Sequence, residues 1–287
     1  MPLFQRILVA VDSTDHSVRM ARSLLKLPST SRAQVTALHV VPKQTGAVSM
    51  RENQEQGAQF LKDAVEQLSV QPDITVSTRL EEGDAKTTVL KVADDIDASL
   101  IVMGARGMGR LMSILKNSVS QYVFQLSTRP MLLVKEEAFI GQLRRVMVAI
   151  DGSEAAREAL SDAIALVRDI SGSEILLARV IDRAEASSRK APIEQLERED
   201  KVLADALALL KRDKVSHRAY FAIGDPGREI AMLSGESGAN LLVMGSPDRR
   251  PTVAKGLPDL ERLLGKSVSD YVRVHAACPV LMTRLQA

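Results

Sequence analysis

An internal repeat constrains the fold of this chain more than any other feature of the sequence. Residues 4–13, which read FQRILVAVDS, match residues 143–152, which read LRRVMVAIDG, without a gap. Further matches follow in the same order in both halves: residues 97–104 with 238–245, residues 118–123 with 267–272, and Pro130 with Pro279. The chain therefore contains the same kind of domain twice.

Each half is long enough to bury its own hydrophobic core, because 287 residues suffice for about two domains of ordinary size. A short charged stretch with Gly141, near residues 136–142, lies between the two copies. We therefore expect a first domain over residues 1–139 and a second domain over residues 143–287.

Within the first copy, apolar runs alternate with segments of helical periodicity. Short apolar runs predict strands, and apolar residues three and four apart predict amphipathic helices. Strands that alternate with helices predict an α/β fold, with an open, parallel, five-stranded sheet in each copy and helices on both faces. Strands are expected at residues 6–11, 34–41, 74–80, 100–104 and 131–134, helices at 13–27, around 60–68, after Asp84 and at 118–126, and irregular structure at 45–56.

Composition excludes several classes of protein. The formal net charge of +2, with acidic and basic residues interspersed, gives no reason to expect binding to nucleic acid or to an anionic membrane. The single cysteine, Cys278, cannot form an internal disulfide and fits a reducing compartment. Residues 1–6 have neither the charged start nor the long apolar stretch that a secretory signal would show, and no apolar run of the sequence approaches the length of a membrane span. We expect a soluble, cytoplasmic protein.

A glycine-rich segment follows the fourth expected strand of the first copy. This strand ends at Gly104, and Gly107 and Gly109 precede a polar helix start near Ser118. Glycines let backbone N–H groups approach a ligand, and a helix start adds unpaired donors and the positive end of the helix dipole. The order of strand, glycine loop and helix predicts an anion site for phosphate, with a plain tight turn as the alternative.

The spacing of this segment resembles that of a known family. Two residues separate Gly104 from Gly107, and nine more precede Asn117-Ser118, which resembles the Gly-x2-Gly-x9-Gly-Ser/Thr nucleotide loop of the universal stress protein family. The resemblance extends over nearly the entire chain, once in each copy. It implies two tandem Rossmann-like domains of the HUP type, ATP as ligand, and Mg²⁺ held through the phosphates with help from Asp12.

The resemblance also implies which residues contact the nucleotide. Asp12 would lie near the ribose or phosphates, and Val41 would contact the adenine. Asn117 stands where the family has its third glycine; because Asn tolerates a left-handed backbone, we expect binding to survive but to weaken. The expected nucleotide-binding residues are Asp12, Ser13, Val41, Met103, Gly104, Arg106, Gly107, Gly109, Asn117, Ser118, Val119 and Ser120.

The second copy departs further from the family pattern. Asp248 replaces the second glycine of the loop, which places a carboxylate where a phosphate would bind, and like charges repel. Its loop from Gly245 to Ser267 is also longer than the loop from Gly104 to Ser118. We therefore expect the first domain to carry the nucleotide site.

Three functions remain open at this stage. The preferred one is a stress-response regulatory module that binds ATP, as a homodimer of tandem chains. The second is a nucleotide-free interaction scaffold that assembles through residues 131–134 and 280–282. The third is a weak ATPase, or a protein that phosphorylates itself on Ser118 or Ser120. The four histidines show no metal-ligand spacing, and no residue stands out as a catalytic base, so we expect at most weak ATP hydrolysis.

Overall fold

The computed structural model of the protein describes residues 4–43, 47–105, 118–135, 142–189, 191–246 and 267–284. The chain divides into two compact units, Met1–Ile140 and Gly141–Ala287. Each unit contains one copy of the repeated sequence. Among the described residues, none of the helices combines the length and the apolar character that a membrane span needs.

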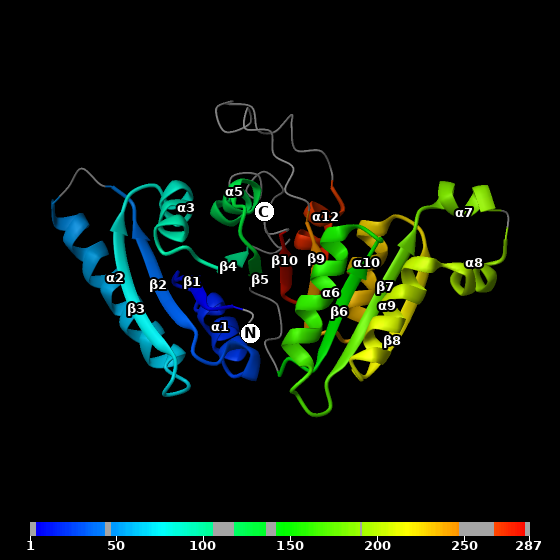
Figure 1. Ribbon diagram of the computed structural model, residues 1–287. Helices are drawn as coiled ribbons and strands as arrows, with labels where there is room; N and C mark the ends of the chain where they lie inside the picture. Colours follow the sequence, from blue (N-terminus) through cyan, green and yellow to red (C-terminus); the bar gives the residue numbers. More distant parts are fainter. Residues whose placement is uncertain are drawn as a thin grey trace. The chain divides into compact units, whose positions relative to one another are not determined.

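The first unit contains a parallel sheet of five strands. Its strand order is β3-β2-β1-β4-β5, so the chain winds outward from β1 in one direction and then from β4 in the other (Figure 1). The winding therefore reverses between β1 and β4, which is where open parallel sheets bind their ligands. The strands are β1 (Arg6–Ala10), β2 (Gln34–Val41), β3 (Thr75–Glu82), β4 (Leu100–Ala105) and β5 (Met131–Lys135).

Helices cover both faces of this sheet. α1 and α2 pack against each other, α1 over β4 and β5 and α2 over β2 and β3, while α3 and α5 pack together on the opposite face. The core between these layers is aliphatic: Ile7, Leu8 and Val9 on β1 have no exposed surface. The helices are α1 (His16–Leu25), the 3-10 helix η1 (Pro28–Thr30), α2 (Ala47–Leu68), α3 (Ala85–Asp95) and α5 (Val119–Leu126).

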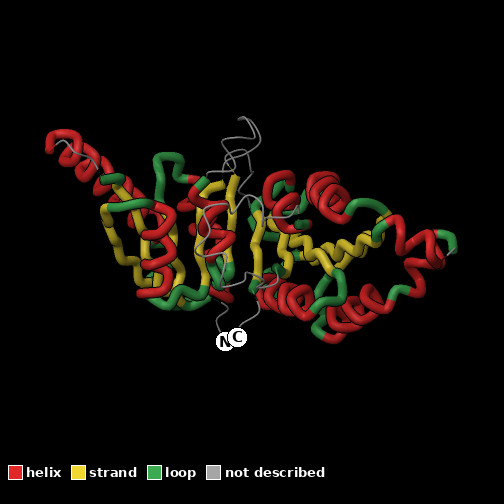
Figure 2. The backbone as a smooth tube through the Cα atoms, turned by 90° about the horizontal axis from the view of Figure 1, so that it is seen from above, coloured by secondary structure: helices red, strands yellow, loops and turns green. Residues whose placement is uncertain are grey.

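The second unit repeats this architecture. Its strand order is β10-β9-β6-β7-β8, again all parallel, and in Figure 2 its strands (yellow) run between helices on either side. Its strands are β6 (Arg145–Ile150), β7 (Glu174–Ile181), β8 (His217–Ile223), β9 (Leu241–Gly245) and β10 (Val280–Thr283). Its helices are α6 (Glu154–Val167), α7 (Arg183–Arg189), α8 (Ile193–Glu199), α9 (Lys201–Arg212), α10 (Pro226–Glu236) and α12 (Val268–His275).

The predicted fold class is confirmed, and one predicted segment is wrong. The polar sequence predicts irregular structure over residues 45–56, yet residues 47–56 form the first half of α2, and residues 45 and 46 lie outside the described residues. This half of the helix has exposed charged side chains that pair along its surface, as Arg51 does with Glu55 at 3.0 Å. Pairs four residues apart stabilise a solvated helix without an apolar face.

Candidate functional site

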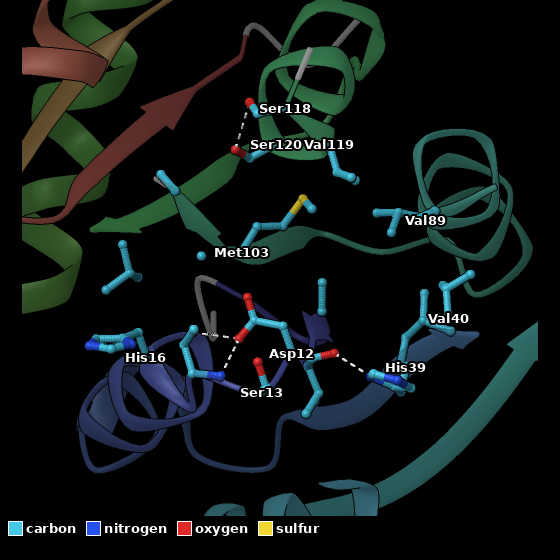
Figure 3. A pocket seen from close by; sticks show the side chains of 18 residues that line it. Asp12, Ser13, His16, His39, Val40, Val89, Met103, Ser118, Val119 and Ser120 are labelled. Carbon is cyan, nitrogen blue, oxygen red and sulfur yellow. Dashed lines mark hydrogen bonds between the residues drawn. The ribbon is translucent and has the colours of Figure 1, made fainter. Parts of the chain in front are cut away.

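A cavity of about 480 Å³ opens in the first unit at the carboxyl ends of β1, β2 and β4 (Figure 3). It lies where the winding of the sheet reverses, and the starts of α1, α3 and α5 also border it. Its lining residues are Ala10, Val11, Asp12, Ser13, Thr14, His16, Leu38, His39, Val40, Ala85, Val89, Met103, Gly104, Ala105, Ser118, Val119, Ser120 and Val134.

The loop between β1 and α1 holds Asp12 in a fixed position. The backbone N–H and the hydroxyl of Thr14 both donate to Asp12 Oδ1, at 2.9 and 2.5 Å. The hydroxyl of Ser17 donates to the carbonyl of Ala10 at 2.7 Å and ties the start of α1 to the end of β1. One carboxylate oxygen of Asp12 is therefore committed to the loop, and no hydrogen bond to the other is found within the described part of the chain.

Gly104 leaves room for this carboxylate. A Cβ atom built on Gly104 would lie 3.3 Å from Asp12 Oδ2, which is tighter than an ordinary contact. Because Gly104 has no side chain, the Asp12 carboxylate lies next to the exposed backbone of β4 at the floor of the cavity. A ligand can approach such a backbone closely.

The start of α5 supplies hydroxyl groups. Ser118 is the N-cap residue, and its Oγ accepts the backbone N–H of Gln121 at 3.1 Å. The hydroxyls of Ser118 and Ser120 lie 3.5 Å apart, and both residues are buried. Ser118 is thus a helix cap, and it also lines the cavity at a helix start, where backbone donors and the helix dipole favour an anion.

The opposite end of the cavity is apolar. In Figure 3 Val40 from β2 and Val89 from α3 lie on the same side of the cavity, and Leu38 and Ala85 from the same two elements also belong to the lining. His39 lies beside them, and its Nδ1–H donates to the carbonyl of Val11 at 2.8 Å. The cavity therefore combines an aliphatic end with an end that presents hydroxyls, a carboxylate and bare backbone.

The structure brings together part of the predicted set of site residues. Asp12, Ser13, Met103, Gly104, Ser118, Val119 and Ser120 line the cavity, whereas Arg106, Gly107, Gly109 and Asn117 lie outside the described residues. Val41 is not among the lining residues: it is buried, and its carbonyl accepts the N–H of Gly83 at 3.0 Å, while its neighbour Val40 lines the cavity instead.

Sequence reasoning missed the remaining lining residues. Most of them follow from position alone, because they lie at the carboxyl ends of β1, β2, β4 and β5 or in the first turns of α1 and α3. His16 carries the clearest signal among them, since it is a polar aromatic residue four positions after Asp12. The missed residues are Ala10, Val11, Thr14, His16, Leu38, His39, Val40, Ala85, Val89, Ala105 and Val134.

The described lining contains Asp12 as its one carboxylate, and the described residues hold no cluster of three or more acidic, histidine or cysteine side chains that could bind a metal ion by themselves. Magnesium in proteins is often held by one or two carboxylates together with phosphate and water oxygens. The donor set around Asp12 therefore fits a cation that a phosphate ligand brings with it, rather than a resident metal.

Comparison with known proteins identifies the family. The model of the Universal stress protein family matches the chain twice, at residues 3–135 and 142–284. The chain belongs to the universal stress protein family.

Individual relatives agree with this tandem organisation. A universal stress protein of Bacillus subtilis, YxiE, is 29% identical over 149 residues, which are 46% of this chain and 100% of that protein. Sll1654 of Synechocystis is 32% identical over 136 residues, 46% of this chain and 86% of that protein. Among solved structures, a universal stress protein of Archaeoglobus fulgidus shares the fold with a TM-score of 0.73 at 20% identity, over 97% of this chain and 96% of that chain.

The second universal stress domain has the same loop after its first strand but packs it differently. Asp151 Oδ1 accepts the N–H of Ser153 at 2.9 Å, as Asp12 accepts that of Thr14. A Cβ atom on Gly245 would lie 2.3 Å from the carbonyl carbon of Ala155. The first turn of α6 therefore lies directly on the end of β9, at the place where Gly104 faces a carboxylate in the first domain.

Two further positions of the second domain make contacts that differ from those of the first. A Cβ atom on Gly152 would meet Val202 of α9 at 2.8 Å. Arg179 occupies the position of His39, since it follows Ala178 of β7 as His39 follows Leu38 of β2 in the matching register. Its guanidinium Nε donates to Asp200 Oδ2 at 3.0 Å, with both side chains buried. The universal stress protein thus has a cavity beside Asp12 in its first domain, and the matching residues of its second domain make different contacts, with the first turn of α6, with Val202 and within a buried ion pair.

Proposed function

We propose that this universal stress protein binds one adenine nucleotide, ATP, in the cavity of its first domain and acts as a stress-response regulatory module. The observation that carries this proposal is the division of the cavity into an aliphatic end and a polar end that includes the start of a helix. A nucleotide has the same division, with a flat, largely apolar base at one end and anionic phosphates at the other.

The arrangement of the two ends supports an orientation for the ligand. The base would lie between Val40 and Val89, where the lining is aliphatic, and the phosphates would extend past Gly104 toward Ser118 and Ser120. Hydroxyls and backbone donors at a helix start stabilise phosphate by hydrogen bonds and by the helix dipole.

The asymmetry between the domains supports a stoichiometry of one. In the second domain the first turn of α6 lies against Gly245, Val202 lies against Gly152, and Arg179 pairs with the buried Asp200. We propose that a nucleotide at this place would have to displace these groups, and separating a buried ion pair costs several kcal/mol.

The chemistry of the described lining favours binding over turnover. Hydrolysis of ATP requires a group that positions and activates a water molecule. Asp12 is the one carboxylate of the described lining, and its Oδ1 is committed to Thr14. We therefore propose that bound ATP biases the conformation or the assembly of the protein, with slow hydrolysis at most.

Two measurements on the full chain test the proposed function. Mass spectrometry of the protein purified under native conditions should identify a co-purifying adenine nucleotide, and equilibrium dialysis should show saturable uptake of labelled ATP. GTP and CTP serve as competitors, and we expect them to displace ATP less well than ADP does. No uptake at millimolar ATP would overturn the proposal and would leave the nucleotide-free scaffold as the better account.

A further inference from the structure

His16 differs from the other three histidines of the chain. The Nδ1 atoms of His39, His217 and His275 each donate to a backbone carbonyl at 2.8 Å, of Val11, Val215 and Tyr271 respectively. The Nδ1 atom of His16 is buried and has no hydrogen-bond partner among the residues that the structure describes. Buried polar atoms in proteins are nearly always paired, so an unpaired one needs an explanation.

The local structure gives His16 no structural task. It is the first residue of α1, whose N-cap residue, Asp15, makes no side-chain cap bond. A residue at this helix position needs no imidazole, and the Nδ1 atom contributes no hydrogen bond to the described part of the fold. The second domain confirms that the position tolerates a small side chain, because Ala155 lies four residues after Asp151, as His16 lies four residues after Asp12.

The position of His16 relates it to the polar end of the cavity. His16 lines the cavity together with Gly104 and Ala105 at the end of β4 and Val134 on β5, the two strands that α1 covers. In Figure 3 His16 lies on one side of Asp12, and His39 and Val40 lie on the other. The imidazole thus lies on the side of Asp12 opposite Val40.

We propose that the His16 imidazole contacts the anionic end of the bound nucleotide and makes the cavity prefer a nucleoside polyphosphate to a nucleoside. This inference rests on the proposed function and adds a specificity-determining residue to it. An imidazole N–H is a good donor to a phosphate oxygen. Rotation of the ring to present that donor breaks no hydrogen bond of Nδ1, because this atom makes none within the described part of the chain. The described lining contains no lysine or arginine, so His16 and His39 are its two side chains with N–H donors, and His39 is committed to Val11.

The test compares ligands that differ only in their phosphates. Calorimetric titration of the full chain with ATP, ADP, AMP and adenosine gives the ratio of the dissociation constants for adenosine and ATP. In His16→Leu, which keeps an apolar side chain of similar size, we expect ATP affinity to fall about tenfold and adenosine affinity to change less than twofold. His16→Gln, which keeps an N–H donor, should recover part of the ATP affinity. His217→Leu in the second domain is the matched control and should leave the ratio unchanged.

Each other outcome has a distinct meaning. If His16→Leu leaves the ratio unchanged, or weakens ATP and adenosine equally, the role of His16 is overturned while the proposed function stands. If His16→Gln behaves as His16→Leu does, the imidazole acts through its shape and the hydrogen-bond proposal is wrong. If the unaltered chain binds neither ATP nor adenosine, the proposed function fails, and the role of His16 fails with it.

Discussion

Gly104, near the end of β4, lies directly against Asp12, which follows the end of β1: a Cβ atom on Gly104 would be 3.3 Å from the carboxylate oxygen Oδ2. The loop also fixes this carboxylate, because Thr14 donates to Oδ1 from its backbone and from its hydroxyl. The floor of the cavity therefore depends on the Asp12 carboxylate, which Thr14 holds in place, and on the absence of a side chain at Gly104.

Substitution of Gly104 should therefore weaken ATP binding in proportion to the size of the new side chain. We expect Gly104→Ala to raise the dissociation constant for ATP about threefold to tenfold and Gly104→Val to raise it more than tenfold, as calorimetric titration measures. Gly235→Ala on α10, where a Cβ atom would meet only Ala277 at 3.4 Å, is the control. Unchanged ATP affinity in a folded Gly104→Val protein would contradict the position of the phosphates.

Two substitutions of a helical glycine by alanine should have opposite effects on stability. A Cβ atom on Gly57 of α2 would lie 2.7 Å from Cδ2 of His39 and 2.9 Å from Cδ1 of Leu80, so Gly57→Ala should destabilise the first domain by about 1 kcal/mol despite its gain in helix propensity. Gly235→Ala should stabilise the second domain by about 0.5 kcal/mol. Urea unfolding measures both; destabilisation of equal size in the two variants would contradict the packing of α2 on His39.

The buried ion pair of the second domain, Arg179–Asp200, should contribute to the free energy of unfolding and not to the affinity for ATP. Arg179→Ala leaves Asp200 buried without its partner, and we expect the free energy of unfolding to fall by about 3–5 kcal/mol. Arg179→Met combined with Asp200→Ser should recover most of this loss, because serine can still cap α9 as Asp200 does through the N–H of Leu203. Denaturant unfolding measures the loss, and a change in ATP affinity in the folded double variant would place part of the nucleotide site in the second domain.

Asp162 on α6 should make stability depend on pH. Burial, with a smaller contribution from the charge of Glu158, raises the pKa of Asp162 from its ordinary value of 3.8 to about 7. The folded state then binds more protons than the unfolded state between these values, so this residue lowers stability as pH rises from about 4 to about 7. Asp162→Asn should match the unaltered protein near pH 4 and be more stable by roughly 1–3 kcal/mol at pH 8. Thermal melts across this range measure the difference, and a constant difference between the two proteins would contradict the prediction.

The sequence was sufficient to predict the architecture of each domain. Strands such as Leu100–Ala105 are apolar along their whole length because both faces of the sheet are covered, and such runs are easily recognised. Because the chain contains the repeat, each predicted element could be checked against the matching segment of the other half. The first half of α2 was not predicted because it has no apolar face to give a helical pattern, and exposed ion pairs such as Arg51–Glu55 stabilise it instead.

The site was less predictable because it depends on contacts between distant segments. Asp12, Gly104 and Ser118 could be placed at one edge of the sheet, since the carboxyl ends of parallel strands meet there. That Val40 and not Val41 lines the cavity depends on which face of β2 each side chain occupies. The contact of Val202 with Gly152 in the second domain depends on how α9 packs, which no motif near Asp151 indicates.

The central claim is that one nucleotide binds per chain, in the first domain. Calorimetric titration of the full chain with ATP tests it most directly, with Gly104→Val as the variant altered at the proposed site. We predict a stoichiometry close to one for the unaltered chain and a loss of most of the affinity in Gly104→Val. A stoichiometry of two, or binding that Gly104→Val leaves intact, would contradict it.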